Sequence, residues 1–271
     1  MERKQRADVA LVARGLAQSR EKAQALIMSG NVYLREVKVL KPSETVGPQD
    51  ALSVRAPEHP YVGRGALKLE KALRVFGIDP AGLTALDIGA ATGGFTDVLL
   101  QNSAAHVFAI DVGYGQLDWK IRSDPRVTVM ERTNARYLTS ESIGGVVPQL
   151  TVMDVSFISV RLILPAAAAL MAHRGCFCIL IKPQFEAGRE HVGKKGVVRD
   201  PAVHEAVIAA VRDFAPTINY RMVLLDFSPI KGPEGNIEYL AYLCPGTQGT
   251  AVDDVAIRTA VQAAHTQLNG V

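Results

Sequence analysis

Short, largely apolar runs of four to six residues recur through the middle of the chain, and a polar residue stands at or near the end of each. The runs cover residues 85–88, 106–110, 127–130, 149–153 and 176–181. Runs of this length predict buried strands, and the longer segments between them predict crossover helices. This alternation is typical of an α/β fold with a parallel, doubly wound sheet.

Two further apolar runs, residues 221–225 and 238–243, close this pattern differently. The segment between them, residues 229–236, contains Pro229, Gly232, Pro233 and Gly235 and is too short for a crossover helix. Parallel neighbours need such a crossover, so these two strands should form a hairpin. The expected fold is therefore Rossmann-like, with a mostly parallel seven-stranded sheet and one antiparallel strand.

The first 56 residues follow a different pattern of short elements. Residues 7–13 predict a helix stopped by Gly15, and Ser19 caps a second helix that ends before Gly30. Strands are expected at 32–34, 38–40 and 51–54. Arg35-Glu36, between the first two strands, is a poor hairpin turn by intrinsic preference. This segment should form a small α+β domain.

Pro57 and Pro60 bracket polar residues and mark a linker, since neither helix nor sheet continues easily through them. The expected organisation is a small domain at 1–56, a linker at 57–62 and the α/β domain at 63–271. With 271 residues, the chain is long enough for both domains.

Charge is distributed unevenly between the two predicted domains. The net charge is +3, but residues 1–64 carry eleven Lys or Arg against seven acids, a balance of +4, which leaves −1 for the remainder. A basic N-terminal segment followed by a near-neutral remainder favours an N-terminal module that binds a polyanion. A solvated charged surface is the alternative explanation.

Membrane and secretory segments are not expected. The longest nearly uncharged stretch, residues 162–172, contains Pro165 and falls short of the ~20 apolar residues of a spanning helix. The first residues are polar, unlike a secretory signal, so a cytoplasmic location is expected. Cys176 and Cys178 alternate in an apolar strand, where a core role is more plausible than a metal site.

A glycine-rich turn follows the first strand of the α/β domain, in the stretch Asp87-Ile88-Gly89-Ala90-Ala91-Thr92-Gly93-Gly94-Phe95. Position 91 is alanine, whereas a dinucleotide fingerprint needs glycine there to admit a pyrophosphate. Asp111 ends the next strand at roughly the 20-residue interval of a ribose-binding carboxylate. The polar residues 131–134, which end in Asn134, follow the third strand and could hydrogen-bond the same ligand. A ligand with a ribose and no phosphate is therefore favoured over a turn without a ligand.

Four charged residues are expected at the same edge of the sheet: Lys68, Asp154, Lys182 and Glu238. A lysine accepts a proton from a weak acid such as a hydroxyl only if burial or a neighbouring cation lowers the lysine pKa. Lys68 beside Lys182 would supply such a cation, while the acids would orient the amines. Surface charges or structural ion pairs are the alternative for each residue alone.

These motifs resemble those of known families. The pattern Asp-x-Gly-x-x-x-Gly-Gly from Asp87 resembles motif I of the S-adenosylmethionine-dependent methyltransferases, and the Lys-Asp-Lys-Glu set resembles the FtsJ-type ribose 2′-O-methyltransferases. The pattern Arg6-x-Asp8-x-x-Leu11 and the helices after it resemble the S4 RNA-binding domain. That resemblance implies RNA contacts from the basic residues of its two helices, which are Arg3, Lys4, Arg6, Arg20 and Lys22.

Together with Gly63-Arg64-Gly65-Ala66 and Lys182-Pro183-Gln184-Phe185-Glu186, the whole chain resembles the TlyA family of ribosomal RNA cytidine 2′-O-methyltransferases, historically also called haemolysins. The resemblance implies S-adenosylmethionine as cofactor, ribosomal subunits as partners and no metal. The residues it implies for the cofactor are Asp87, Gly89, Ala90, Thr92, Gly93, Gly94, Phe95, Asp111, Val112 and Asn134. Further RNA contacts are expected from Arg64, Arg189, Lys194 and Lys195. The basic front and the helix after Asp253 resemble the longer subtype, which acts on both subunits.

Two other functions remain as alternatives: a membrane-active haemolysin, and an RNA-binding protein with a vestigial methyltransferase domain. The sequence lacks a long amphipathic helix with a basic face outside the enzyme domain, which disfavours the first. The complete four-residue set disfavours the second. Residues 185–200, rich in glycine and cations and without an apolar period, predict a mobile loop at the mouth of the site.

Overall fold

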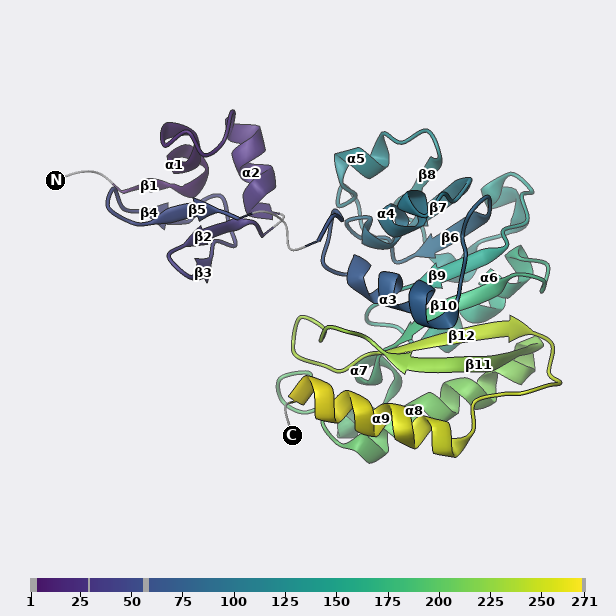
Figure 1. Cartoon of the computed structure of the whole chain (residues 1–271). Coiled ribbons are helices and arrows are strands. Elements are labelled where there is room, and N and C mark those ends of the chain that lie inside the picture. Colours follow the sequence, from purple (N-terminus) through teal and green to yellow (C-terminus); the bar gives the residue numbers. More distant parts are fainter. Residues whose placement is uncertain (1–3, 29, 56–58, 270–271) are drawn as a thin grey trace. The chain divides into compact units, whose positions relative to one another are not determined.

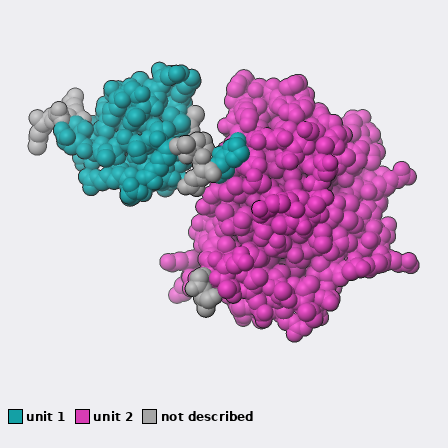
Figure 2. Space-filling model, viewed as in Figure 1, with its two compact units in different colours: residues 1–60 teal, residues 61–271 magenta. Residues whose placement is uncertain are grey.

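The computed structural model describes residues 4–28, 30–55 and 59–269 (Figure 1). The chain forms two compact units, residues 1–60 and 61–271 (Figure 2). Arg3, and residues 57 and 58 of the expected linker, lie outside the described residues.

Unit 1 combines two helices with short strands. Its helices are α1 (Ala7–Ala13) and α2 (Arg20–Met28), and the Ser19 side chain accepts a hydrogen bond from Lys22 N as the expected cap. The strands are β1 (Gln5–Arg6), β2 (Val32–Leu34), β3 (Val37–Lys38), β4 (Thr45–Val46) and β5 (Leu52–Val54). Strand β2 lies between β3 and β5, and β1 pairs with β4. Leu11, Ile27 and Val32 are buried in the shared core.

The hairpin between β2 and β3 forms in spite of its unfavourable turn residues. Leu34 pairs with Val37, so Arg35 and Glu36 alone make the turn, and Arg35 adopts a φ of +58°. The strand predicted at 38–40 therefore begins one residue earlier and ends at Lys38. Strands β1 and β4 were not predicted, because two-residue strands carry no measurable period.

Unit 2 contains the predicted seven-stranded sheet. Its strands are β6 (Thr84–Ile88), β7 (His106–Ile110), β8 (Val127–Met130), β9 (Leu150–Met153), β10 (Cys176–Ile181), β11 (Tyr220–Phe227) and β12 (Tyr239–Pro245). Their order is β11-β12-β10-β9-β6-β7-β8. Strand β12 runs antiparallel to both β10 and β11, while the other pairs are parallel. The predicted closing hairpin with one antiparallel strand is thus confirmed.

Helices cover both faces of this sheet. The α-helices are α3 (Ala66–Phe76), α4 (Gly94–Gln101), α5 (Trp119–Arg122), α6 (Leu164–Leu170), α7 (Pro183–Glu186), α8 (Pro201–Phe214) and α9 (Asp254–Asn269). Short 3-10 turns are η1 (Ala135–Tyr137), η2 (Ser140–Ile143), η3 (Val160–Leu162), η4 (Arg189–His191) and η5 (Ala215–Ile218). Helices α3 and α4 pack on one face, whereas α6, α8 and α9 pack on the other. In Figure 1, α9 lies beside β11, and α8 packs against α9.

Strand β10 illustrates why these sequences form a doubly covered sheet. Phe177, Ile179 and Ile181 face the core of α6, α8 and α9, while Cys178 and Leu180 face that of α3 and α4. Both sets are buried, as expected for a central strand whose apolar run is continuous rather than alternating. Among the described residues, no helix combines the length and apolar character needed to cross a membrane.

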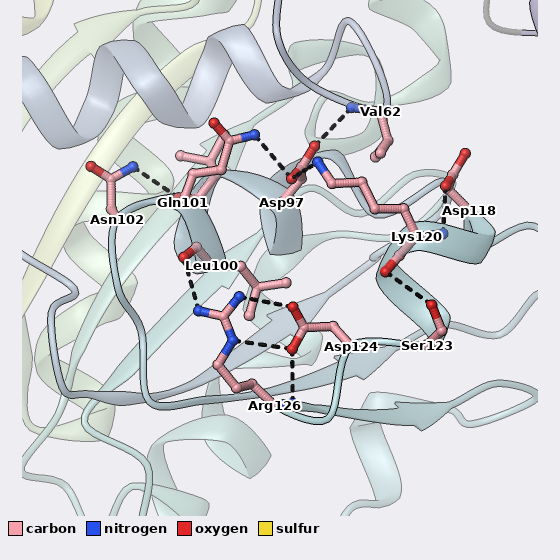
Figure 3. A network of polar contacts seen from close by, with 11 residues as sticks. Val62, Asp97, Leu100, Gln101, Asn102, Asp118, Lys120, Ser123, Asp124 and Arg126 are labelled. Atoms are coloured by element: carbon pink, nitrogen blue, oxygen red, sulfur yellow. Dashed lines mark hydrogen bonds and ion pairs between the residues drawn. The ribbon is translucent and has the colours of Figure 1, made fainter.

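A buried carboxylate fastens the start of unit 2 to two of its helices (Figure 3). Asp97, on α4, is 1% exposed and accepts hydrogen bonds from the Val62 backbone N at 2.9 Å and from Gln101 Nε2 at 3.0 Å. Lys120 Nζ, on α5, lies 2.9 Å from the same carboxylate. The Asp97 side chain therefore connects three segments: the start of unit 2, α4 and α5.

We expect Asp97→Ala to lower the free energy of unfolding of unit 2 by about 1–3 kcal/mol, because it leaves the Val62 amide and Lys120 without their acceptor. The matched control is Asp124→Ala, which removes hydrogen bonds from the backbone N and the 41%-exposed guanidinium of Arg126, two residues away, and should cost about 1 kcal/mol because it disconnects no separate segment. Urea unfolding followed by circular dichroism measures both. Equal losses for the two variants would contradict the structural role of Asp97.

Candidate active site

The close approach of two strand ends sets the floor of the site. Gly89, directly after β6, has a φ of +88°, and a Cβ built there would lie 2.6 Å from the backbone oxygen of Asp154. Only glycine accommodates both the conformation and this contact. The Asp154 N donates to Ile88 O at 3.0 Å, which holds the end of β9 against the turn.

Asp87 lies behind the glycine-rich turn and lines neither of the cavities described below. It is fully buried, and Thr96 Oγ1 donates to its Oδ2 at 2.6 Å. Burial raises the pKa of Asp87 to about 7, against the opposing effect of the Thr96 hydrogen bonds. Its position suits a residue that holds the first turn of α4 rather than one that contacts a ligand directly.

Asp111 joins the glycine-rich turn to the next strand-to-helix connection. Its Oδ2 accepts from Ala91 N at 2.8 Å, and its Oδ1 accepts from Gly113 N at 2.7 Å. A carboxylate has about four lone-pair positions, so both oxygens retain capacity for further donors. The side chain faces a cavity, where those donors can belong to a ligand.

Two adjoining cavities lie along the carboxyl edge of the sheet. One, of about 550 Å³, is lined by Gly89, Ala90, Thr92, Gly94 and Phe95 of the turn together with Lys68, Asp154, Lys182 and Glu238. The other, of about 430 Å³, is lined by Asp111, Val112 and Asn134. Gly89, Ala91, Asp154, Ser156 and Phe157 line both cavities, which therefore form one cleft with two lobes.

Gly93 is the predicted turn residue that packs away from this cleft. It lines neither cavity, and a Cβ there would meet Leu117 at 2.9 Å and Ile121 at 3.0 Å. Its φ of +92° also favours glycine. Gly93 therefore shapes the turn and allows the α5 region to approach, and its predicted contact with the cofactor stays a prediction.

The structure brings together all four residues of the predicted charged set. Lys68 Nζ lies 2.6 Å from Glu238 Oε2 and 3.1 Å from Asp154 Oδ2. Lys182 Nζ lies 2.5 Å from Asp154 Oδ1 and 3.1 Å from Ser156 Oγ. Lys68, Lys182 and Glu238 are each less than a tenth exposed. Asp154 thus bridges the two lysines at the wall of the larger lobe.

This arrangement changes the expected role of Lys68. Burial lowers the pKa of Lys68, but the carboxylates of Asp154 and Glu238 outweigh it and hold the pKa above its ordinary value. Burial raises the pKa of Asp154, and the two ammonium groups outweigh that effect, so the pKa of Asp154 lies below its usual range. The sequence predicts Lys68 beside Lys182 as a cation, with the acids orienting the amines; the structure places Asp154 in contact with both amines, so the cation of Lys68 is balanced by its carboxylate partners.

Several lining residues were not predicted from the sequence. Ser156 and Phe157 come two and three residues after Asp154, and Gln184 and Phe185 come two and three residues after Lys182, so all four sit where a strand end opens into the cleft. Phe157 is 91% exposed and adopts a φ of +65°, an uncommon conformation for an aromatic residue. Their position after a catalytic candidate was the available signal.

The residues predicted to bind RNA are distributed over both units. In unit 1, Lys4 is exposed, Arg6 and Arg20 both contact Asp8, and Lys22 Nζ donates to Gln18 Oε1 at 2.5 Å. In unit 2, Arg64 donates to the backbone oxygen of Lys231 at 3.1 Å. Arg189, Lys194 and Lys195 are exposed, and the two lysines line a separate cavity of about 400 Å³ with His191 and Arg199.

Residues 185–200 are anchored more firmly than the sequence suggested. Val198 is 2% exposed, its N donates to Asn236 Oδ1 at 3.0 Å, and its oxygen lies 3.0 Å from Nε2 of the buried His204. Asn236 Nδ2 also donates to Gly196 O. The segment is therefore anchored at Gly196 and Val198, and the mobility of the rest of the loop stays a prediction. Within the described ranges, no group of His, Cys, Asp and Glu side chains could hold a metal ion.

Comparisons with known proteins agree with this geometry. The sequence profile of the FtsJ-like methyltransferases matches residues 61–244, and that of the S4 domain matches residues 5–52. The 16S/23S rRNA (cytidine-2′-O)-methyltransferase TlyA of Mycobacterium tuberculosis is 48% identical over 244 residues, which is 90% of this chain and 91% of the relative. Hemolysin A of Brachyspira hyodysenteriae is 40% identical, over 88% of this chain and 98% of the relative.

A solved structure from Streptococcus thermophilus, under a provisional hemolysin name, is similar to the whole chain. Its TM-score is 0.79 at 42% sequence identity, and the match covers 100% of this chain and 98% of the other. Sequence relatives, both domain profiles and a solved structure thus agree along nearly the full length. The chain belongs to the TlyA family, in which an S4 domain precedes an FtsJ-like methyltransferase.

Proposed function

We propose that this protein is an S-adenosylmethionine-dependent methyltransferase that modifies the ribose 2′-hydroxyl of cytidine in ribosomal RNA. The observation that carries the proposal is the Lys68-Asp154-Lys182-Glu238 cluster in the cleft beside the Asp111 lobe. The name of the M. tuberculosis relative supports the choice of cytidine and of ribosomal RNA from either subunit.

The chemistry of the smaller lobe fits S-adenosylmethionine. Asp111 offers carboxylate oxygens to ribose hydroxyls, and Asn134 can offer its amide NH2 to an adenine edge, since its Oδ1 already accepts from Arg136 N. Ile110 and Ile163 line the same lobe and supply apolar contact for a base. Gly89 and Ala91, shared with the larger lobe, would admit the sulfonium end toward the lysines. When bound, this cofactor supplies an electrophilic methyl group.

Lys182 is the residue we assign to the reacting hydroxyl. Its Nζ is held at two points, by Asp154 and by Ser156, and it lines the larger lobe. Lys68 stays protonated between Asp154 and Glu238, so it cannot accept a proton and instead fixes the Asp154 carboxylate. The positions of both Asp154 oxygens are thereby set before a substrate arrives.

The reaction requires the 2′-oxygen to bond to the methyl carbon while the hydroxyl proton leaves. Lys182 Nζ would orient the hydroxyl and stabilise the charge that develops on its oxygen. To take up the hydroxyl proton as the bond forms, Lys182 must enter the step as a neutral amine, its own proton having passed to solvent beforehand. Asp154 would stabilise the resulting ammonium through the contact already present. Glu238 acts one step further away, by keeping Lys68 in place.

Ribosomal RNA would be held by the exposed cations of both units. Arg6, Arg20 and Lys22 come from the S4 unit, and Lys194 and Lys195 come from the loop that lines the third cavity. Phosphate contacts of this kind supply affinity rather than sequence specificity. We place the protein with its proposed substrate, the ribosomal subunits of the cytoplasm. The complete set of ion pairs in the cluster supports an active rather than a vestigial site.

We expect Lys182→Ala to lower kcat by at least about 100-fold, the scale of one proton-transfer group. S-adenosylmethionine affinity should change little, since Lys182 does not line the lobe of Asp111. Single-turnover methylation of ribosomal RNA and calorimetric titration of the cofactor measure the two quantities. The matched control is Lys120→Ala, on the surface at α5, which should retain kcat. A Lys182→Ala protein that binds cofactor poorly and still methylates RNA would refute the assignment.

Asp111→Ala should weaken S-adenosylmethionine binding by about 1.5–3 kcal/mol, the contribution of a hydrogen bond to a charged group. The variant also frees the amides of Ala91 and Gly113, so thermal unfolding is measured alongside cofactor titration. Asp124→Ala serves as the control, because Asp124 pairs with Arg126 outside the cleft. Unchanged cofactor affinity in a folded Asp111→Ala protein would remove Asp111 from the binding site.

A further inference from the structure

One buried carboxylate in unit 1 accepts hydrogen bonds from several neighbouring side chains. Asp8, the second residue of α1, is fully buried. It accepts from Arg6 Nε and Nη2, Arg20 Nε and Gln24 Nε2, each at 3.0 Å, and from its neighbour Val9 N at 3.0 Å. The hydrogen bonds from Arg6 hold the pKa of Asp8 well below its usual range in spite of burial. Asp8 is therefore ionised throughout the neutral range.

The two arginines use only part of their hydrogen-bonding capacity on Asp8. Arg6 contributes Nε and Nη2, and Arg20 contributes Nε alone. Among the described residues, Nη1 of Arg6 and both Nη atoms of Arg20 donate to no partner. Their side chains are 46% and 55% exposed. Each guanidinium is thus fixed on its inner edge and open to solvent on its outer edge.

Other cations in unit 1 lack this arrangement. Arg14 donates through both Nη atoms to the backbone oxygens of Asp50 and Gly47, which ties it to the loop before β5. Lys22 contacts only a glutamine amide at the surface. Among the described cations of this unit, Arg6 and Arg20 alone share a buried carboxylate.

We propose that Asp8 is a positioning residue, which holds Arg6 and Arg20 as a preorganised pair of forks for neighbouring phosphate groups of the RNA backbone. The proposal rests on the RNA-binding function proposed for the S4 unit. Planar guanidinium groups bind phosphate oxygens through two parallel hydrogen bonds. Side chains that are already ordered lose less entropy on binding than free ones, so Asp8 would increase RNA affinity although it is itself an anion.

The positioning role of Asp8 and its negative charge predict opposite effects of Asp8→Asn on RNA affinity. Asp8→Asn adds +1 to unit 1, and counterion release by itself would then favour tighter RNA binding. If Asp8 positions the arginines, the variant instead weakens binding, because the guanidinium groups must be ordered when the RNA arrives. We expect the Kd for ribosomal RNA and the KM for RNA to rise about tenfold. The cofactor Kd, and kcat at saturating RNA, should stay within twofold.

A double-mutant cycle on the full-length protein separates positioning from a general effect on folding. Arg6→Ala/Arg20→Ala is measured with and without Asp8→Asn, by RNA titration at several salt concentrations. In the background without the arginines, Asp8→Asn should not weaken binding, since nothing remains for it to position. Binding by Asp8→Asn that equals or exceeds that of the original protein would overturn the proposal. So would an equal loss in both backgrounds.

A second variant covers the case in which Asp8→Asn does not fold. Arg6→Lys/Arg20→Lys keeps both positive charges but removes the planar guanidinium groups. RNA binding should therefore weaken by about tenfold without a change of net charge. RNA binding at the original strength would overturn the proposal. If Arg6→Ala/Arg20→Ala leaves RNA binding and methylation unchanged, the proposed RNA-binding role of the S4 unit fails instead.

Discussion

The structure of unit 2 depends on the close approach of the ends of β6 and β9 at Gly89. A side chain at that position would meet the backbone oxygen of Asp154, and the conformation itself excludes most other residues. Because the two strand ends lie this close, Asp154 stands between the glycine-rich turn and the lysines. The lobe of Asp111 and the lobe of Lys182 can then share one floor, which is the geometry that transfer of a group between two bound molecules requires.

Charge balance in the cluster explains why four residues are present rather than one lysine. A lone buried ammonium group is unfavourable, whereas Lys68 gains two carboxylate partners. The carboxylate of Asp154 is in turn shared with Lys182, so Lys68 and Glu238 together set the field in which Lys182 operates. In the proposed mechanism, residues that do not touch the substrate therefore hold in place the one that does.

The sheet could be predicted because its strands are continuous apolar runs, and its edge could be predicted because polar residues follow those runs. The four charged residues were found for the same reason, together with the family resemblance. Pairwise geometry was not available from the sequence: nothing in the order of residues indicated that Asp154 would separate Lys68 from Lys182. The anchoring of Val198 was missed because two adjacent valines show no period, and because one of its partners, Asn236, lies 38 residues further along the chain.

The strand order has a consequence for the protein while it is being synthesised. Strand β12 contains the last residues of the sheet to leave the ribosome, yet it inserts between β10 and β11. Until residue 245 has emerged, β10 has one unpaired edge and β11 has no neighbour. Lys68 likewise lacks the carboxylate of Glu238 until about 170 further residues have been synthesised. A nascent chain therefore acquires the S4 unit first and its charged cluster last, so that methyl transfer becomes possible only when the sheet is complete.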